Sequence, residues 1–418
     1  MATDLAQPEI APGQSAVVRA VRRGNPWPAR GILLLALLIA GFAVVRLALD
    51  LQPIPELSQV ERLLGQGKTS EAERVLKTIL ARSPENGDAR MRLARLLASR
   101  GDRLACAETL HEVPWWWPTK RKALFLEGQT FHECKLARRA EAAWRACVRD
   151  DPLHPAEPGL VKNAAQSLVG YFLVQGRLDD ARQVLWDAYA QASSEEQPAV
   201  LGTRLRVELE RIDPKESVGV LRDYLAADPA DHESRRALAL AYQLNGDAVT
   251  SDRLIQECLR SRPKDPRVWQ TWLAILQDRN DAAGLSRALT ALPRGIGQDL
   301  EILKAKAADF ESNGRLEDAA GALRDALKVD DFDEEAHFRL ARVLQRLDQP
   351  EQAARHRARY QELSKARDAL PKALAEYGEL SREATTDDKL RASIERLAEL
   401  SEQLGWGRLA REWRKQVP

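Results

Sequence analysis

The hydrophobic positions of this chain fall into short stretches in which apolar residues return every three or four residues, the spacing of one face of an α-helix. No stretch shows sustained alternation of apolar and polar residues, so strands are not predicted. The breaks between the stretches recur: Gly67 and Gly101 are 34 residues apart, as are Pro84, Pro118 and Pro152 in turn. A fixed period of this length predicts an all-helical chain built from a repeated pair of antiparallel helices.

Residues 121–154 show which positions the repeat keeps. Small residues stand where two helices approach closely, and large apolar residues fill the space between the helices. A proline near the end of the unit stops the second helix, because it lacks an N–H and its ring clashes with the preceding turn. The positions that follow this pattern are Leu124, Gly128, Phe131, Ala140, Trp144, Cys147 and Pro152. In type and spacing they resemble the tetratricopeptide repeat.

This resemblance implies an all-α, right-handed superhelical solenoid, in which antiparallel helix pairs stack around one continuous core. The C-terminal residues 368–418 are expected to form further helices, a partial repeat at 391–418 and a polar cap. Unit 198–231 has lost most markers of its first helix. The solenoid is expected over residues 53–367, in the units 53–86, 87–120, 121–154, 162–195, 198–231, 232–265, 266–299, 300–333 and 334–367.

The residues before the repeats have a different character. Residues 1–30 contain several prolines and no apolar period, and they are predicted to be a disordered cytoplasmic tail. Residues 31–49 are apolar apart from Arg46, and they are close to the ~20 residues that a transmembrane helix needs. The aliphatic stem of Arg46 lets its charge reach the membrane interface. A cleaved signal peptide is the alternative, although no A-x-A site follows the segment.

The charges around residues 31–49 predict an orientation. Arginines precede this segment, whereas Asp50 and Glu56 follow it closely. The positive-inside rule therefore places the N-terminus in the cytoplasm and the repeats on the other side of the membrane. Because arginine greatly outnumbers lysine, as in proteins of GC-rich bacteria, we expect a single-pass protein of the bacterial inner membrane with extracytoplasmic repeats.

The rest of the composition argues against several classes of function. The net charge is +1, so the chain lacks the basic excess of a nucleic-acid binder. It contains no HExxH, GxSxG or GxxxxGK[ST] motif, and its six histidines are scattered. Aspartates and glutamates are expected on solvated helix faces. We therefore predict a protein that is not an enzyme, with no catalytic residue, metal site or cofactor and no small-molecule substrate.

The repeat positions of the four cysteines predict which of them are buried. Cys106, Cys147 and Cys258 occupy positions where the family usually has alanine, so each is expected to pack as a small hydrophobic residue. Cys134 falls near the end of a first helix and is the one candidate for an exposed thiol. A disulfide between Cys134 and Cys147 is the alternative in an oxidising compartment.

The resemblance also implies a binding surface. In this family the first helix of each unit lines a concave groove that binds protein or peptide segments. The candidate groove residues at the equivalent positions are Met91, Arg95, Phe125, Gln129, His132, Arg236, Gln243, Phe338 and Arg342. Further residues at such positions are Gln166, Gln270, Gln277, Lys304 and Gln345. The groove is rich in amides and arginines, which suits a peptide backbone better than a small apolar ligand.

A cluster of three tryptophans interrupts the end of unit 87–120. Trp116 falls at a position that is normally packed, so it is expected to be buried, with Trp115 and Trp117 on either side. If Trp115 or Trp117 is exposed, it becomes a candidate anchor for a partner, because tryptophan is enriched at binding hot spots. The alternatives are packing of all three rings on the neighbouring unit and contact with the membrane interface.

Together these expectations describe a membrane-anchored scaffold or adaptor that binds partner proteins. Bacterial proteins of similar architecture act in envelope assembly, secretion or maturation, and we expect a role of this kind. The alternative is a regulatory or targeting subunit of an enzyme complex whose catalytic chain is encoded elsewhere.

Overall fold

The computed structural model describes residues 55–418 apart from 155–156, 158, 210–211, 383–386 and 418. The chain divides into two units, Met1–Glu56 and Leu57–Pro418, and all helices named here belong to the second. The expected tail 1–30 and transmembrane helix 31–49 lie outside the described residues. Within the described part, no helix is both long and apolar enough to cross a membrane.

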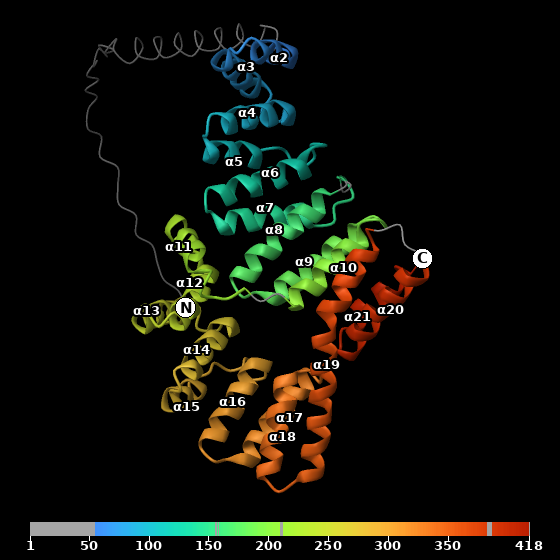
Figure 1. Cartoon of the computed structure of the whole chain (residues 1–418). Coiled ribbons are helices and arrows are strands. Elements are labelled where there is room, and N and C mark those ends of the chain that lie inside the picture. The colour runs from blue at the N-terminus through green and yellow to red at the C-terminus, as the bar shows by residue number, and fades with distance from the viewer. Residues whose placement is uncertain (1–54, 155–156, 158, 210–211, 383–386, 418) are drawn as a thin grey trace, which may run out of the picture. The chain divides into compact units, whose positions relative to one another are not determined.

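The predicted all-helical class is confirmed, because the described residues form helices and contain no strand (Figure 1). The helices that fall in the first five units are α2 Leu57–Gly65, α3 Thr69–Arg82, α4 Gly87–Ser99, α5 Arg103–His111, α6 Lys120–Glu133, α7 Ala137–Val148, α8 Leu160–Val174, α9 Leu178–Gln191, α10 Gln197–Leu209 and α11 Val218–Ala227. The remaining helices are α12 His232–Leu244, α13 Ala248–Ser261, α14 Pro266–Asp278, α15 Ala282–Thr290, α16 Leu300–Ser312, α17 Leu316–Val329, α18 Glu334–Arg346, α19 Pro350–Leu380, α20 Asp387–Gln403 and α21 Gly407–Arg414.

The turn inside each helix pair follows the 34-residue period. One residue of the turn takes a positive φ, which ends the first helix in the left-handed conformation. Glycine fills that position at Gly314, with φ 72°. Lys135 and Asp348 take the same conformation, with φ 63° and 56°, at multiples of 34 residues from the glycines. The turn geometry therefore persists where the sequence lacks glycine.

Aspartate and asparagine side chains begin many of the first helices. Asp231 accepts a hydrogen bond from the backbone N–H of Ser234, Asp299 from those of Glu301 and Ile302, and Asp333 from that of Ala336. These bonds satisfy amide groups that have no partner within the helix. Acidic residues therefore recur at one end of successive helices, which bears on the site below.

The C-terminal end of the solenoid departs from the expected unit boundaries. Helix α19 does not end near residue 367 but continues to Leu380, with Pro371 inside it. On both sides of residue 367 it carries buried residues, among them Leu363, Ala366 and Leu370. Apolar contacts of a helix stabilise it beyond its intrinsic propensity, so burial of this face offsets the hydrogen bond that Pro371 removes.

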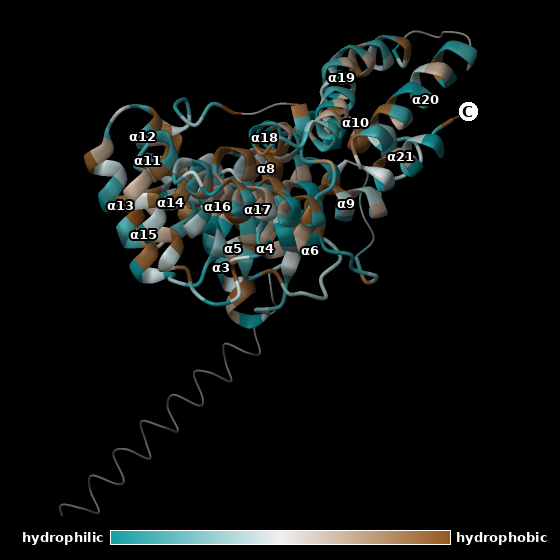
Figure 2. Ribbon diagram, turned by 90° about the horizontal axis from the view of Figure 1, so that it is seen from below, coloured by the Kyte–Doolittle hydropathy of each residue, from teal (hydrophilic) through white to brown (hydrophobic). Residues whose placement is uncertain are grey.

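The largest departure from a regular stack occurs at α10. Instead of forming a hairpin with α11, α10 packs against α9 and reaches α19 and α21. Leu201 and Leu205 of α10 share one hydrophobic core with Leu363 of α19 and Trp413 of α21. Both views show α10 beside the C-terminal helices and α11 beside α12 (Figures 1 and 2). The weak helix-A pattern of unit 198–231 reflects this different environment.

Polar contacts complete this closure of the solenoid. The hydroxyl of Tyr189 donates to Glu412 Oε2 at 2.9 Å. Gln416 Nε2 donates to that hydroxyl and to Gln197 Oε1, at 3.3 Å each. The guanidinium of Arg408 stands 4.0 Å from the ring centroid of Trp186. Residues more than 200 positions apart in the sequence therefore meet, and the helices between them enclose a space.

Candidate functional site

The closed part of the solenoid contains a cavity of about 760 Å³, which we call the inner chamber. Its lining comes from the beginnings of α9, α14, α16 and α18 and from parts of α10, α12, α19 and the α20–α21 turn. The lining residues are Gly176, Arg177, Leu178, Asp179, Arg182, Glu208, Arg236, Arg267, Gln270, Asp299, Leu300, Glu301, Lys304, Asp330, Phe332, Asp333, Glu334, Glu335, Phe338, Tyr360, Arg367, Leu404 and Trp406. Most of them are charged or aromatic.

One side of the chamber rests on a network that we call the arginine junction, formed by Glu141, Arg145, Arg177, Asp180 and Arg267. It joins α7, α9 and α14 at the place where α10 has left the stack. Arg177 donates to both oxygens of Glu141, at 2.7 and 2.9 Å, and to Asp180 at 2.8 Å. Arg267 also reaches Asp180, at 2.8 Å. Charge-assisted bonds of this kind are directional and strong.

The junction keeps its carboxylates ionised. Burial by itself would raise the pKa of Glu141, but its hydrogen bonds to Arg177 and Arg145 and the charges of these arginines lower it overall. Burial also opposes ionisation of Asp180, and Arg177, Arg267 and Arg145 lower the pKa of that carboxyl in the same way. This side of the chamber therefore consists of cations that are already neutralised by carboxylates behind them.

Residues from α12 extend the same side. Arg236 is buried, and its guanidinium donates to the Gln175 carbonyl at 2.6 Å and to Thr271 Oγ1 at 3.0 Å. Gln175 Nε2 donates to Ser234 Oγ at 3.1 Å. Arg182 pairs with Glu208 at 2.7 Å. The bonds of Gln175 to Arg236 and Ser234 hold the end of α8 against α12, and the pair of Arg182 and Glu208 joins α9 to α10.

The other side of the chamber is acidic. Lys304 of α16 is nearly buried, and its Nζ lies 2.9 Å from Glu301, 3.3 Å from Asp333 and 2.9 Å from Glu335. Burial disfavours the charge of this ammonium, but the three carboxylates outweigh that effect and raise the pKa of Lys304. We call this group the acidic wall, made by Glu301, Lys304, Asp333 and Glu335 together with Asp299 and Asp330 at its edge.

Aromatic rings lie beside the acidic wall. Phe338 of α18 is 43% exposed, an unusual degree for a phenylalanine in a folded chain. Its ring centroid is 5.2 Å from that of Tyr360 on α19. Phe332 packs closely on Gly405, where a side chain would collide with the ring. A concave surface with an exposed aromatic ring and fixed charges is typical of a binding site.

The candidate groove residues fall in different places. Arg236 and Phe338 line the chamber, as do Gln270 and Lys304 from equivalent positions. Arg342 stands 5.7 Å from the Phe338 ring centroid. Gln243 is buried and donates to Asp278 at 2.8 Å, so its amide is already bound within the solenoid.

The remaining candidates lie in the N-terminal repeats, away from the chamber. Met91 and Phe125 are half-buried and pack against hydrophobic cores. His132 Nδ1 lies 2.9 Å from the hydroxyl of Tyr171, and burial lowers the pKa of this histidine. Arg95 and Gln129 are exposed. These five residues are not brought together with the chamber residues.

In the tryptophan cluster, the prediction that Trp116 is buried is wrong. Trp116 is not buried but 54% exposed, and Trp115 is 65% exposed. Trp117 is the ring that packs: it lies against Gly87, and its indole N–H donates to Asp88 at 3.4 Å. The turn after Pro114 shifts the cluster out of the helical register on which the prediction rested. Trp115 and Trp116 meet edge to face, with centroids 5.6 Å apart.

The expectation that acidic side chains face solvent also fails at Glu127. This residue of α6 is only 3% exposed, and Oε1 lies 2.8 Å from His111 Nδ1, while Oε2 has no hydrogen-bond partner among the described residues. Burial raises the pKa of Glu127, against the smaller effect of its bond to His111. The pattern missed it because a glutamate can take a packed position when a partner satisfies one of its oxygens.

The predicted burial of three of the four cysteines is confirmed. Cys106, Cys147 and Cys258 are buried, and Cys134 is half-buried. All four are free thiols, so the Cys134–Cys147 bridge is not formed. Burial raises the pKa of Cys147 to about 12 and that of Cys258 to about 11, which keeps these thiols protonated and unreactive. No group of histidine, cysteine and acidic residues suited to a metal ion occurs in the described part of the chain.

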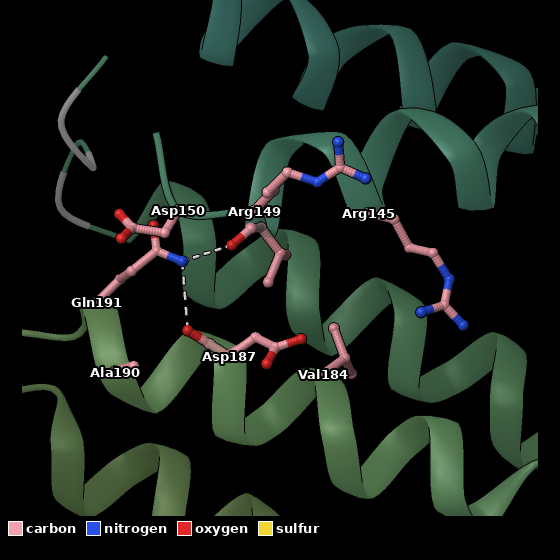
Figure 3. Close-up of a pocket in the computed structure, with 8 residues that line it drawn as sticks. Arg145, Arg149, Asp150, Val184, Asp187, Ala190 and Gln191 are labelled. Carbon is pink, nitrogen blue, oxygen red and sulfur yellow. Dashed lines mark hydrogen bonds between the residues drawn. The ribbon is translucent and has the colours of Figure 1, made fainter. Parts of the chain in front are cut away.

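A second cavity, of about 410 Å³, lies between the C-terminal ends of α7 and α9. Figure 3 shows Arg149, Asp150 and Asp187 around it, with Gln191 bound to backbone carbonyls of both helices. Val148 and Val184 form its apolar part. In that view the side chain of Arg149 lies at the top of the cavity and that of Arg145 runs down its right side. It is smaller than the inner chamber and has no exposed aromatic ring.

One part of the chain is similar in sequence to a known repeat family. A sequence model of the tetratricopeptide repeat matches residues 63–114. A comparison with curated proteins finds no match. Solved structures with some similarity include MamA 41-end from Desulfovibrio magneticus RS-1, with 20% identity, a TM-score of 0.32 and coverage of 41% of this chain and 96% of that chain.

Two further structures are similar over longer parts of the chain. Pseudomonas aeruginosa PilF has 13% identity, a TM-score of 0.32 and coverage of 54% of this chain and 91% of its own. A human IFIT1 dimer with PPP-AAAA has 12% identity, a TM-score of 0.34 and coverage of 79% and 90%. The match shows a tetratricopeptide repeat at residues 63–114, and the helix pairs that begin at 232, 266, 300 and 334 keep the 34-residue period of such repeats.

Proposed function

We propose that this protein is a scaffold that binds a segment of a partner protein in the inner chamber. The observation that carries the proposal is Phe338, whose ring is 43% exposed beside Tyr360 on the concave side of the closed solenoid. An aromatic side chain that remains exposed in a concave surface offers apolar area to a partner without a further cost of ordering. The repeat architecture supports a role in protein–protein interaction, and no catalytic step is proposed.

The size of the chamber supports a segment as its occupant. Its volume of about 760 Å³ lies within the ~300–1,000 Å³ of pockets that enclose compact ligands, so a folded domain does not fit. The fixed charges around it offer hydrogen-bonding groups to a peptide backbone. A short extended stretch of a partner, or a chain terminus, matches both properties.

We further propose that residues 31–49 hold the scaffold at a bacterial inner membrane, with the repeats outside the cytoplasm and a role in envelope assembly, secretion or maturation. The support for this part is the apolar sequence and the arginines before it. An activity-based reporter fused after Pro418 tests it: activity on the cytoplasmic side would contradict the orientation.

The binding proposal is tested by purifying the tagged full-length chain from its native membranes and identifying the proteins that elute with it. The Phe338→Ala variant is expected to lose the partner, at least tenfold. Val329→Ala is the matched control, since Val329 of α17 is also an exposed apolar residue, at 56%, but does not line the chamber. Equal recovery with Phe338→Ala and wild type would contradict the proposal.

A third variant separates the two exposed aromatic surfaces. The double substitution Trp115→Ala and Trp116→Ala removes the other prominent pair of exposed rings, which lies in the N-terminal repeats. If the chamber is the binding site, this variant retains the partner. If only the tryptophan variant loses the partner, the binding site is the exposed pair Trp115 and Trp116 and not the chamber.

A further inference from the structure

The two sides of the inner chamber differ in the charge that they leave for a ligand. On the acidic wall, the single ammonium of Lys304 is shared by three carboxylates, Glu301, Asp333 and Glu335. The side chains of Glu301 and Glu335 are 56% and 54% exposed, so they still face the open space. Arg339 also approaches Glu335, at 3.4 Å, but it is held more closely by Glu311, at 2.8 Å. Two cations thus face four carboxylates.

Two more carboxylates at the edge of the acidic wall have no cation within 4 Å among the described residues. Asp299 accepts backbone N–H groups at the start of α16. Asp330 accepts the N–H of Phe332. These bonds orient the carboxylates but leave their charge uncompensated. The wall as a whole therefore carries an excess of negative charge in a concave, partly desolvated place, where charge acts more strongly than on an open surface.

The opposite side of the chamber has no comparable excess of positive charge that could bind an anionic ligand. Arg177 and Arg267 are held by carboxylates of the arginine junction, and Arg182 is held by Glu208 and Asp179. An anionic ligand would have to break these pairs and would leave buried carboxylates without partners, which costs several kcal/mol in proteins. A cationic ligand at the acidic wall breaks no ion pair, because Glu301 and Glu335 share the single ammonium of Lys304 and their side chains are still exposed.

The aromatic rings favour the same choice. The face of a phenylalanine or tyrosine ring attracts an ammonium or guanidinium group within about 6 Å. Phe338 and Tyr360 lie beside the acidic wall in the same cavity. The protein's own Arg342 already stands 5.7 Å from the Phe338 centroid, so this ring accepts a guanidinium from one side.

We infer that the partner segment bound in the inner chamber is basic, with an arginine or lysine that reaches Glu301 and Glu335 beside the ring of Phe338. This inference rests on the proposed function, because it names the chemical class of the segment that the chamber takes. Attraction between the wall and a basic segment also speeds association and makes binding depend on salt.

The test uses the full-length chain in detergent and two fluorescent peptides of glycine and serine, identical except that one carries arginines where the other carries glutamates. The arginine peptide is expected to bind at least tenfold more tightly at low salt and to weaken as salt is added. Glu301→Gln together with Glu335→Gln is expected to reduce its affinity about tenfold, while Asp333 still partners Lys304.

The matched control is Glu317→Gln with Glu351→Gln, which makes the same change of charge at exposed positions that do not line the chamber. It is expected to bind like wild type. Equal binding of the two peptides, or full binding by the Glu301 and Glu335 variant, would overturn the inference. If the native partner still depends on Phe338 in that case, the chamber remains the binding site and only its preference for a basic segment is wrong.

Discussion

The joint between α17 and α18 and the joint between α9 and α14 connect parts of the same solenoid in different ways. Between α17 and α18 the contact is made by Leu323, Ala326, Leu340 and Leu344, all of them fully buried in one apolar cluster. Between α9 and α14 the contact runs through the arginine junction, where Arg267 reaches Asp180 at 2.8 Å. The first joint follows the 34-residue repeat, and the second does not.

The difference shows what each kind of contact can specify. Apolar burial has no direction and is proportional to the area removed from water, so it stabilises any helix that presents the right face. The hydrogen bonds of Arg177 to Glu141 and Asp180 require a particular partner in a particular orientation. The charged joint occurs where α10 has left the stack and helices that are not neighbours in sequence must meet. We therefore expect the arginine junction to fix the closure of the chamber.

The largest effect is expected at Arg177. Replacing it with alanine leaves Glu141 and Asp180 partly buried without their principal partner, and removing one member of a buried pair costs about 3–5 kcal/mol. The measurement is the free energy of unfolding in urea. Arg315→Ala is the matched control, because Arg315 of α17 pairs with Asp318 at an exposed site and its loss costs about 0–1 kcal/mol. If the two variants lose the same free energy of unfolding, the arginine junction contributes no more to stability than an exposed ion pair.

The second prediction concerns pH. The folded chain lowers the pKa of Glu141 and of Asp180. A group whose pKa is lower in the folded state contributes stability that is complete above its unfolded pKa, about 4, and is lost as the pH falls through the folded value. The free energy of unfolding is therefore expected to decrease as the pH falls below about 5. Glu141→Gln should cost about 1–3 kcal/mol at neutral pH and flatten this dependence.

Leu323→Ala provides the comparison from the apolar joint. It is expected to cost about 2–5 kcal/mol, because it leaves a cavity among fully buried residues. Since no titrating group is involved, the loss should be the same at every pH. Glu208 also has a lowered pKa, so some pH dependence remains in Glu141→Gln. If the free energy of unfolding of Glu141→Gln changes with pH as steeply as that of wild type, Glu141 is not a source of the pH dependence.

These two joints also mark how far the sequence determines the structure. The helix pairs, their turns and the apolar joints follow from a pattern that is local and repeated, and residues such as Cys147 and Ala140 are buried as their positions predict. The closure at α10 depends on contacts with α19 and α21, which lie far away in the sequence, and no periodicity encodes them. The expected hairpin within unit 198–231 is wrong for this reason.

The candidate site could likewise be predicted only in part from the sequence. Arg236 and Phe338 could be placed on the concave side from their repeat positions, and both line the chamber. Glu301, Asp333 and Glu335 were missed, because an acidic residue near the start of a helix is ordinarily a solvated cap. One signal could have found them: Lys304 at a groove position, with acidic residues three before it and at the start of the next unit.

The smallest expected effect concerns the turn inside a repeat. It tests whether the repeat beside the charged joint and the repeat beside the apolar joint have the same turn conformation. Lys135, in the α6–α7 turn, takes a left-handed conformation that costs a residue with a side chain about 1 kcal/mol, whereas Gly314 takes a similar conformation without this cost. Lys135→Gly is therefore expected to raise the free energy of unfolding by about 0.5–1 kcal/mol. Asp348→Gly, in the α18–α19 turn, should gain less, because aspartate tolerates this conformation better.

Both variants are measured by urea unfolding beside Gly314→Ala, which places a side chain in the same conformation and is expected to lose about 1 kcal/mol. The sign should not depend on whether the neighbouring joint is charged or apolar, since the turn closes within one repeat. A stabilisation by Asp348→Gly with none by Lys135→Gly would mean that the charged joint strains the repeat beside it. The two joints would then differ in backbone conformation as well as in the side chains that form them.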